Sequence, residues 1–85
     1  MNMTVEETIR SFIAREILYS GEGFAFSDEV SFLQEGIIDS MGVMEIVAFI
    51  EKQFGVRPEA HEIVPENFDS VKRLAAYVRR KQEAV

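Results

Sequence analysis

The sequence predicts a small all-α protein, and two observations carry this prediction. Apolar residues recur at helical spacing in three segments, and no stretch alternates apolar and polar residues for long enough to indicate a strand. With 85 residues, of which 47% are hydrophobic, the chain can fill one compact core. We therefore expect a single domain over residues 1–85. Its predicted architecture is a small four-helix bundle with three main helices, one short helix and a long apolar loop between the first two.

The first predicted helix begins after Thr4. Thr4 and Glu7 have the spacing of a capping box, in which two side chains satisfy backbone N–H groups at a helix N-terminus. The apolar residues that follow share one helical face over roughly four turns: Val5, Ile9, Phe12, Ile13 and Ile17. The Ser-Gly-Glu-Gly segment at 20–23 is expected to end this helix.

Residues 21–39 are too long for an ordinary structureless connection. They are also too apolar for a solvated loop, since they include Phe24, Phe26, Val30, Phe32, Leu33, Ile37 and Ile38. We therefore expect this segment to lie across the helices as part of the core. Its length also predicts that the two helices it joins run roughly parallel, because no short turn can connect helices in that orientation.

The second predicted helix runs from Ser40 to Phe54, with Gly55 as the left-handed residue that ends it. Asp39 and Ser40 precede an apolar helix, which is typical of an N-cap. A core-facing stripe follows at helical spacing and consists of Val43, Ile46, Val47, Ile50 and Phe54.

A second apolar arc on the same helix comprises Met41, Met44 and Ala48, and charged residues surround it. Two interpretations remain open at this point. The arc can be buried as part of a larger core that the loop at 21–39 covers. It can equally form a surface that meets several partners, because methionine side chains adapt to different shapes.

The last predicted helix begins after Asp69 or Ser70, either of which can cap it. Pro65 opens a single short turn, Pro-Glu-Asn-Phe, before it. Its predicted buried face consists of Val71, Leu74, Ala75 and Val78, and its outward face of Lys72, Arg73, Arg79 and Arg80.

Charge is distributed unevenly along the chain. Residues 16–69 carry twelve acids and two bases, a net charge of −10, whereas residues 70–85 have a net charge of +4. An acidic body repels phosphate backbones, so we expect no nucleic-acid binding and we expect partners with basic patches.

The absence of Cys excludes disulfides and thiolate metal sites. No apolar run is long enough for a membrane span and no signal peptide is recognisable, so a cytoplasmic monomer is expected.

An enzyme is the least favoured function class. A serine nucleophile needs a base, and the one histidine, His61, lies in a polar connection where we expect it to be exposed. No G-x-S-x-G elbow, phosphate-binding glycine loop, EF-hand or histidine-containing metal cluster is present. No catalytic residue and no metal ligand is predicted.

The segment DSMGVMEIVAFIEKQFGV, residues 39–56, closely resembles the Asp-Ser-Leu motif and second helix of the acyl carrier protein family. The resemblance extends over nearly the whole chain, through SFLQEGIIDS at 31–40 and NFDSVKRLAAYV at 67–78. That family includes carriers of fatty acyl, polyketide, aminoacyl and peptidyl groups.

The resemblance implies a carrier whose modified residue is Ser40. Ser40 matches the serine that receives 4′-phosphopantetheine from coenzyme A through a separate transferase, and Asp39 matches the adjacent acid that helps to position the transferase's magnesium ion. The thiol of the arm then holds acyl groups as thioesters. The implied partners are the phosphopantetheinyl transferase and acyl ligases, transferases or synthases. Ser40 therefore needs no catalytic partner in this chain, because the enzyme comes from outside.

Two further sets of residues follow from the resemblance. The expected partner-binding surface on the second helix consists of Met41, Met44, Glu45, Ala48 and Glu51. The expected acyl pocket between the helices consists of Ile46, Ile50, Ile63, Leu74 and Val78.

The chain departs from carriers of primary fatty acid synthesis in two ways. Its second helix has few acids and carries Lys52, and its last helix is basic. We therefore expect a specialised lipid or secondary-metabolite carrier, in which Lys52 repels the basic patches of general fatty acid biosynthesis enzymes. Arg79, Arg80 and Lys81 are then candidates to attract an acidic partner.

The alternatives are an aminoacyl or peptidyl carrier, or a helical interaction module that carries nothing. Met41 replaces the motif's usual leucine, a volume-conserving change.

Overall fold

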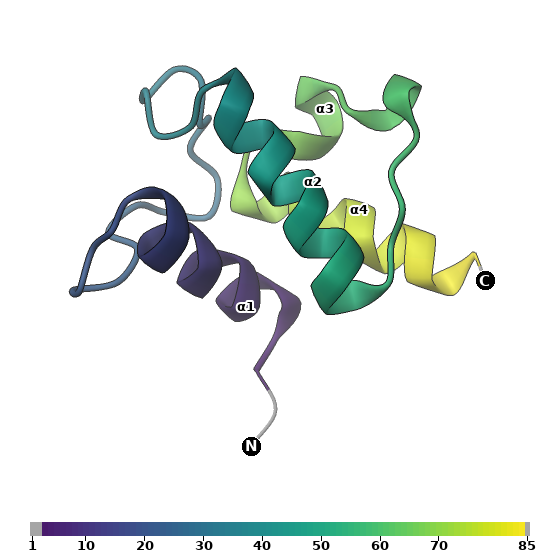
Figure 1. Ribbon diagram of the computed structural model, residues 1–85, viewed down its shortest axis with the longest axis horizontal. Coiled ribbons are helices and arrows are strands. Elements are labelled where there is room, and N and C mark those ends of the chain that lie inside the picture. Colours follow the sequence, from purple (N-terminus) through teal and green to yellow (C-terminus); the bar gives the residue numbers. More distant parts are fainter. Residues whose placement is uncertain (1–2, 85) are drawn as a thin grey trace.

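The computed structural model describes residues 3–84, and this part of the chain is helical without a β-strand (Figure 1). In chain order the elements are α1 (Val5–Phe12), the π-helical turn η1 (Ile13–Ile17), α2 (Ser40–Phe54), the 3₁₀ turn η2 (Ala60–Glu62), α3 (Pro65–Phe68) and α4 (Val71–Glu83). The predicted all-α class, with three main helices and one short helix, is confirmed. No helix within residues 3–84 has the length and apolar character needed to cross a bilayer.

The first helix begins as predicted, and its last helical turn ends at Ile17, ahead of the Ser-Gly-Glu-Gly segment that was expected to end it. Thr4 Oγ1 accepts a hydrogen bond from the Glu7 N–H at 3.1 Å, and Glu7 Oε1 accepts one from the Thr4 N–H at 2.9 Å, which completes the capping box. At the other end, η1 continues α1 and the chain then turns at Tyr19, whose φ is +52°. A tyrosine therefore adopts a left-handed conformation at the end of this helical segment, before the chain reaches the glycines at 20–23.

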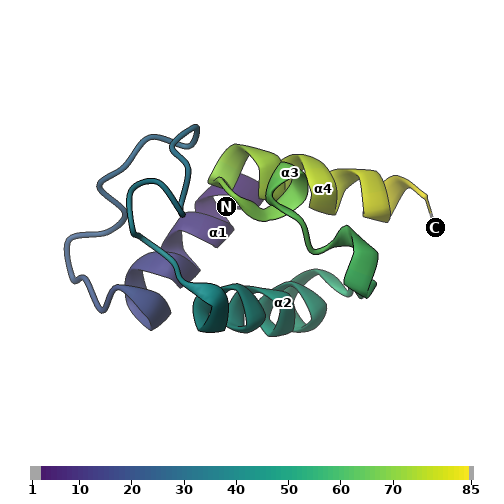
Figure 2. The same cartoon turned by 90° about the horizontal axis from the view of Figure 1, so that it is seen from above.

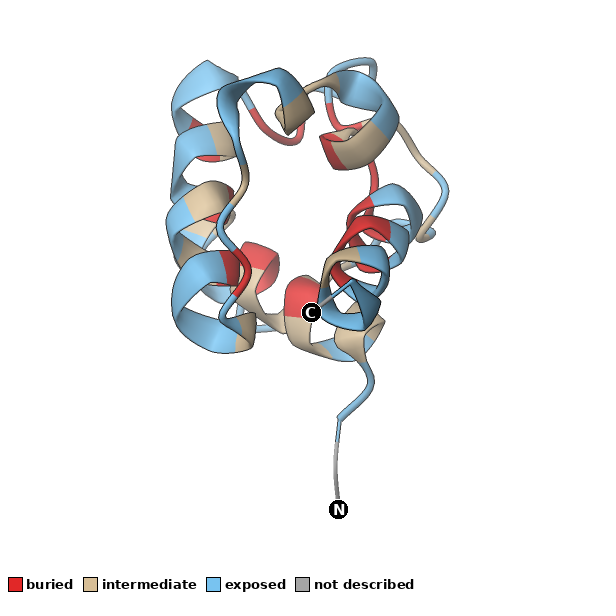
Figure 3. Ribbon diagram, turned by 90° about the vertical axis from the view of Figure 1, so that its right-hand side faces the viewer, coloured by how far each residue is buried: buried red, intermediate tan, exposed pale blue. Residues whose placement is uncertain are grey.

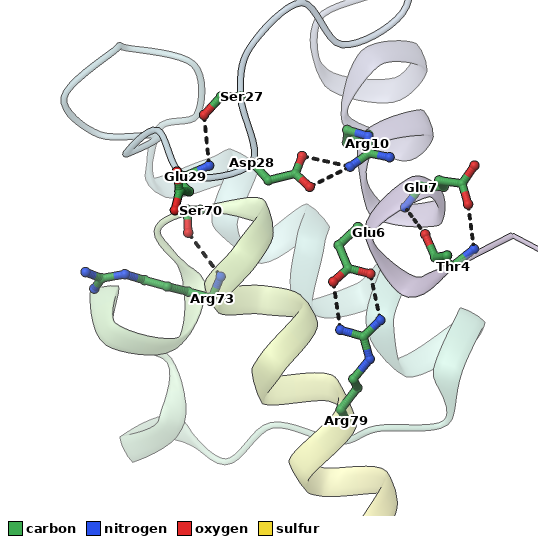
Figure 4. A network of polar contacts seen from close by, with 10 residues as sticks. All are labelled: Thr4, Glu6, Glu7, Arg10, Ser27, Asp28, Glu29, Ser70, Arg73 and Arg79. Atoms are coloured by element: carbon green, nitrogen blue, oxygen red, sulfur yellow. Dashed lines mark hydrogen bonds and ion pairs between the residues drawn. The ribbon is translucent and has the colours of Figure 1, made fainter.

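The long connection at 21–39 is a packed layer of the fold. The Phe32 N–H donates to the Asp69 carbonyl oxygen at 2.8 Å, and the Lys72 N–H donates to the Asp28 carbonyl oxygen at 2.9 Å. Asp69 Oδ1 also accepts from the Leu33 N–H at 3.0 Å. These bonds hold the connection against the α3–α4 junction, and Ser70 is left to cap α4 by accepting from the Arg73 N–H at 3.0 Å (Figure 4).

The prediction that the first two helices run parallel is wrong. Figures 1 and 2 both show α1 and α2 running in roughly opposite directions. A short turn could therefore have joined them. The connection is long because it travels away to the α3–α4 junction and back, and not because of the helix orientation.

One core lies between α1, α2, α4 and the connection (Figure 3). Its buried residues are Ile9, Ile13, Phe32, Ile37, Ile38, Ile46, Ile50, Val56, Phe68, Val71, Leu74, Ala75, Tyr77 and Val78. The connection supplies three of them, as predicted. Phe24 and Val30 pack against this core only partly, whereas Phe26 and Leu33 are 38% and 58% exposed, so the prediction that they are core residues is wrong.

Glu62 fastens the segment before α3 to α4. Its Oε1 accepts from the Glu59 N–H and from the Tyr77 hydroxyl, each at 3.0 Å, and its Oε2 lies 3.0 Å from Lys81 Nζ. The Glu59 N–H and then the Lys81 ammonium lower the pKa of Glu62 to about 2. Burial, followed by the hydrogen bond to Glu62, raises the pKa of Tyr77 to about 12.

The basic residues of α4 are engaged within the chain. Arg79 forms a two-bond pair with Glu6 of α1, both bonds 2.7 Å long (Figure 4), and this hydrogen-bonded pair lowers the pKa of Glu6 to about 2. The Arg80 guanidinium lies 5.9 Å from the centre of the Tyr77 ring and Lys81 pairs with Glu62. Internal contacts therefore engage these cations, and their role in attracting an acidic partner stays a prediction.

We expect the carboxylates of Glu6 and Glu62 to make the stability of the protein fall at acid pH. Their pKa values are lowered from 4.5 to about 2 on folding, so both contribute stability above about pH 4.5 and lose it as the pH falls toward 2. The melting temperature should fall over this range, and less steeply in a Glu6→Gln/Glu62→Gln double variant. Circular dichroism melts at several pH values measure this. An equally steep fall in the double variant contradicts the assignment.

Candidate functional site

The N-terminal turn of α2 brings Asp39 and Ser40 to the surface in different roles. Asp39 is the N-cap residue, since its Oδ1 accepts a hydrogen bond from the Gly42 N–H at 2.9 Å. Ser40 is the first residue inside the helix. The predicted cap is therefore confirmed for Asp39 and wrong for Ser40. Cap preferences could not separate the two, because Asp and Ser serve almost equally well.

The Ser40 hydroxyl is available for modification from outside. Both Ser40 and Asp39 are exposed, and Asp39 already satisfies the helix terminus. The first N–H groups of a helix and its dipole favour a negatively charged group at this end. An exposed hydroxyl at a helix N-terminus can therefore accept a phosphate group, whose negative charge the helix end favours.

Gly42 sets the position of this turn against the core. A Cβ atom on Gly42 would lie 2.6 Å from Cγ2 of Ile38, which is only 4% exposed. The first turn of α2 therefore sits directly on the end of the connection, at a distance that only glycine permits. Helical spacing alone does not predict this role for Gly42, although an isolated glycine within a helical pattern often marks such a close approach.

The predicted partner surface is exposed. Met41 is 76% and Met44 is 58% exposed, and Glu45, Ala48, Glu51 and Lys52 are exposed as well. The connection at 21–39 does not cover them. Of the two interpretations of this arc, the one that places it in the core is therefore wrong, and its role in binding partners stays a prediction.

The predicted acyl pocket is not a cavity. Ile46, Ile50, Leu74 and Val78 are at most 1% exposed and belong to the core, whereas Ile63 lines a cavity together with residues of the connection and α3. Helical spacing identifies which positions point inward but not how completely their neighbours fill the space. Because protein interiors are close-packed, inward positions are normally filled.

A cavity of about 100 Å³ lies instead where α2 meets the connection and α3. Apolar side chains line most of it, including Phe32, Ile38, Val43, Ile63 and Phe68. Ile38 and Val43 flank Ser40 in sequence, so the cavity lies close to the N-terminal turn of α2. Its volume is below that of an engineered cavity of about 150 Å³ that binds benzene, so it has room for a few carbon atoms.

Other side chains that could carry chemistry are not gathered at this site. His61 is exposed in η2, as predicted. Among residues 3–84 no group of three or more His, Cys, Asp or Glu residues is arranged to hold a metal ion.

Comparison with known proteins assigns the family. The family model described as "Phosphopantetheine attachment site" matches residues 7–78, which is most of the chain. The chain therefore belongs to the phosphopantetheine-attachment family. Proteins of this family carry 4′-phosphopantetheine as their prosthetic group and are carriers, not enzymes. The resemblance found in the sequence is confirmed, together with its cofactor.

Two proteins similar to this chain are D-alanyl carrier proteins. The chain is 30% identical over 57 residues to the D-alanyl carrier protein of Abiotrophia defectiva, a match over 67% of this chain and 72% of that protein. It is 25% identical over 80 residues to D-alanyl carrier protein 1 of Lactiplantibacillus plantarum, covering 94% of this chain and all of that one. A chain of the solved structure "Crystal structure of FAD-dependent dehydrogenase" is 35% identical with a TM-score of 0.70, covering 81% of this chain and 96% of that chain.

We expect the two motif residues to differ in their effect on stability. Asp39→Ala removes the N-cap and should destabilise the fold by about 1 kcal/mol, which lowers the melting temperature by about 4–8 °C. Ser40→Ala removes no capping bond and should stay within about 0.5 kcal/mol of the parent. Thermal melts of both variants measure this, and an equal loss in the two would contradict the assignment of Asp39 as the cap.

Proposed function

We propose that 4′-phosphopantetheine is attached to Ser40 and that the protein carries a small aminoacyl group on it. The observation that carries the proposal is the exposed Ser40 hydroxyl at the first turn of α2, left available because Asp39 performs the capping. When attached, the arm supplies a terminal thiol that holds the cargo as a thioester.

Ser40 and Asp39 have different roles when the arm is attached. Ser40 provides the oxygen that becomes part of the phosphodiester, and its position at the helix N-terminus favours the phosphate charge. Asp39 uses Oδ1 for the cap, and its exposed carboxylate can still offer an oxygen ligand to a magnesium ion that the transferase brings. Neither residue needs to act as a base, because the transferase supplies the catalysis.

A small cargo is supported by the packing of the core. Four of the five residues expected to border an acyl pocket are fully packed, and the cavity near Ser40 has a volume of only about 100 Å³. A long acyl chain would have to displace core side chains to enter. The D-alanyl carriers among the relatives carry a cargo of the size that this structure can accommodate.

The partners follow from the same proposal. A phosphopantetheinyl transferase adds the arm and an aminoacyl ligase loads it, with the exposed face of α2 as the expected contact surface. Since the matching solved chain comes from a crystal structure named for an FAD-dependent dehydrogenase, enzymes of that class belong among the partners to test. Coenzyme A is an intracellular donor, which supports a cytoplasmic location. We also propose that the carrier acts as a monomer with one domain.

The attachment is tested by intact-mass measurement. Incubation with a phosphopantetheinyl transferase, coenzyme A and magnesium should add one arm to the wild-type protein and none to Ser40→Ala. Ser27→Ala, which removes another exposed serine hydroxyl, is the matched control and should be modified as the wild type is. Labelling of Ser40→Ala would refute the assignment.

Cargo size is tested with a series of non-hydrolysable acyl analogues attached to the arm, from two to twelve carbons. Each methylene that enters an apolar cavity stabilises the protein by about 0.8 kcal/mol. We expect the melting temperature to rise over the first few carbons and then to level off. Ile63→Ala, which widens the cavity at a half-buried position, should move the plateau to longer chains. A steady rise to twelve carbons in the wild type would show that the core opens for a fatty acyl chain.

Cargo class is tested by direct loading. A ligase that loads D-alanine onto a related carrier should charge the holo protein faster than a ligase that attaches fatty acids. The thioester is identified by mass. Preferential charging with a long fatty acid contradicts the aminoacyl proposal and favours a lipid pathway.

A further inference from the structure

A groove of about 370 Å³ lies beside Ser40, on the α1 side of α2. Asp39, Met41 and Gly42 border it from the start of α2, and Tyr19 borders it from the turn that follows η1. Tyr19 and Met41 are 84% and 76% exposed, more than any other large apolar side chain in residues 3–84. Two bulky apolar groups thus border one groove, and one of them, Met41, directly follows Ser40 in the chain.

Tyr19 also extends the exposed face of α2. A second groove, of about 610 Å³, continues between α1 and α2 toward Ala48 and Lys52, and Tyr19 borders this groove too. The tyrosine therefore links the Ser40 end of α2 with the middle of its exposed face. The partner surface predicted from the sequence lies on α2 alone and does not include Tyr19.

The backbone conformation of Tyr19 indicates that its side chain has a role other than stabilising the fold. A φ of +52° is rare for a bulky residue and is adopted most easily by glycine or asparagine. An almost fully exposed ring gains too little from packing to offset that cost. Strained conformations of this kind persist mostly where function needs the side chain, and π-helical turns such as η1 concentrate at similar places.

Charge identifies the kind of group that fits the groove beside Ser40. Three carboxylates border it, from Glu16, Asp39 and Glu45, and none of its lining residues is basic. An aromatic ring surrounded by carboxylates attracts a cationic side chain, through ion pairing and through the ring face. The neighbouring groove has both charges on its rim, from Arg15 and Lys52 and from Glu16 and Glu45, so a cation is favoured at the Ser40 end.

We propose that Tyr19 and Met41 form a docking site for an arginine or lysine side chain of the phosphopantetheinyl transferase. This inference rests on the proposed function, because an enzyme that modifies Ser40 must approach within reach of the groove that Asp39 and Met41 border. Tyr19 acts here as a binding residue for the enzyme and takes no part in the transfer of the arm.

The decisive variants are Tyr19→Gly and Tyr19→Asn, which remove the ring and relieve the backbone. Each should raise the KM for the carrier in the transferase reaction by about three- to tenfold and leave kcat unchanged. Tyr19→Gly should also raise the melting temperature by a few degrees, up to about 8 °C. Tyr19→Phe keeps the ring and should behave as the wild type in both measurements. A gain in stability together with a loss of docking is a result that a purely structural tyrosine cannot produce.

Two matched controls separate the groove from general effects. Phe26→Ala removes another exposed aromatic ring that does not border the groove, and its KM should stay at the wild-type value. Glu16→Gln and Glu22→Gln change the net charge equally, but only Glu16 borders the groove. Glu16→Gln should raise KM at low salt, whereas Glu22→Gln should change it little.

The outcomes distinguish this inference from the proposed function. An unchanged KM in both Tyr19→Gly and Tyr19→Asn overturns the docking site, and so does an equal rise in Phe26→Ala. If the wild-type protein itself receives no arm at Ser40, the proposed function fails, and the docking site fails with it.

Discussion

The pairing of the 21–39 connection with the α3–α4 junction is the constraint on which the site depends. The backbone bonds from Phe32 to Asp69 and from Lys72 to Asp28 turn a long loop into a layer of the fold. That layer brings Ile38 into the core, and Ile38 forms the surface on which Gly42 and the first turn of α2 rest. The position of Ser40 is therefore set by contacts made at the far end of the connection.

The same arrangement gives Ser40 two different surroundings. On the side of the connection and α3 lies a small apolar cavity, and on the side of α1 lies a groove bordered by carboxylates, Tyr19 and Met41. The first suits a small apolar part of a cargo and the second suits a cationic group of an enzyme. A carrier needs both kinds of contact at one residue, because it must hold a group and also deliver it.

Ion pairs connect the helices at a distance from Ser40. The pairs Glu6–Arg79 and Glu62–Lys81 connect α4 to α1 and to the segment before α3. Two of the basic residues of the last helix thus make contacts within the fold. The acids around the start of α2 have no such partners among the ion pairs of residues 3–84, so they remain available to a basic enzyme surface.

The sequence by itself determined the elements of this protein. Helical spacing, the Thr4–Glu7 capping box and Gly55 are local signals, so the bounds of α2 and the start of α1 followed from them, and the Asp-Ser motif indicated the carrier family. Only the tertiary structure decided which of two adjacent cap residues performs the capping and where a cavity remains. It also decided which charges pair internally and that α1 and α2 run in opposite directions. These depend on how separate segments fill shared space. Only the folded chain brings Ile38 under Gly42, Arg79 to Glu6 and Tyr19 beside Met41.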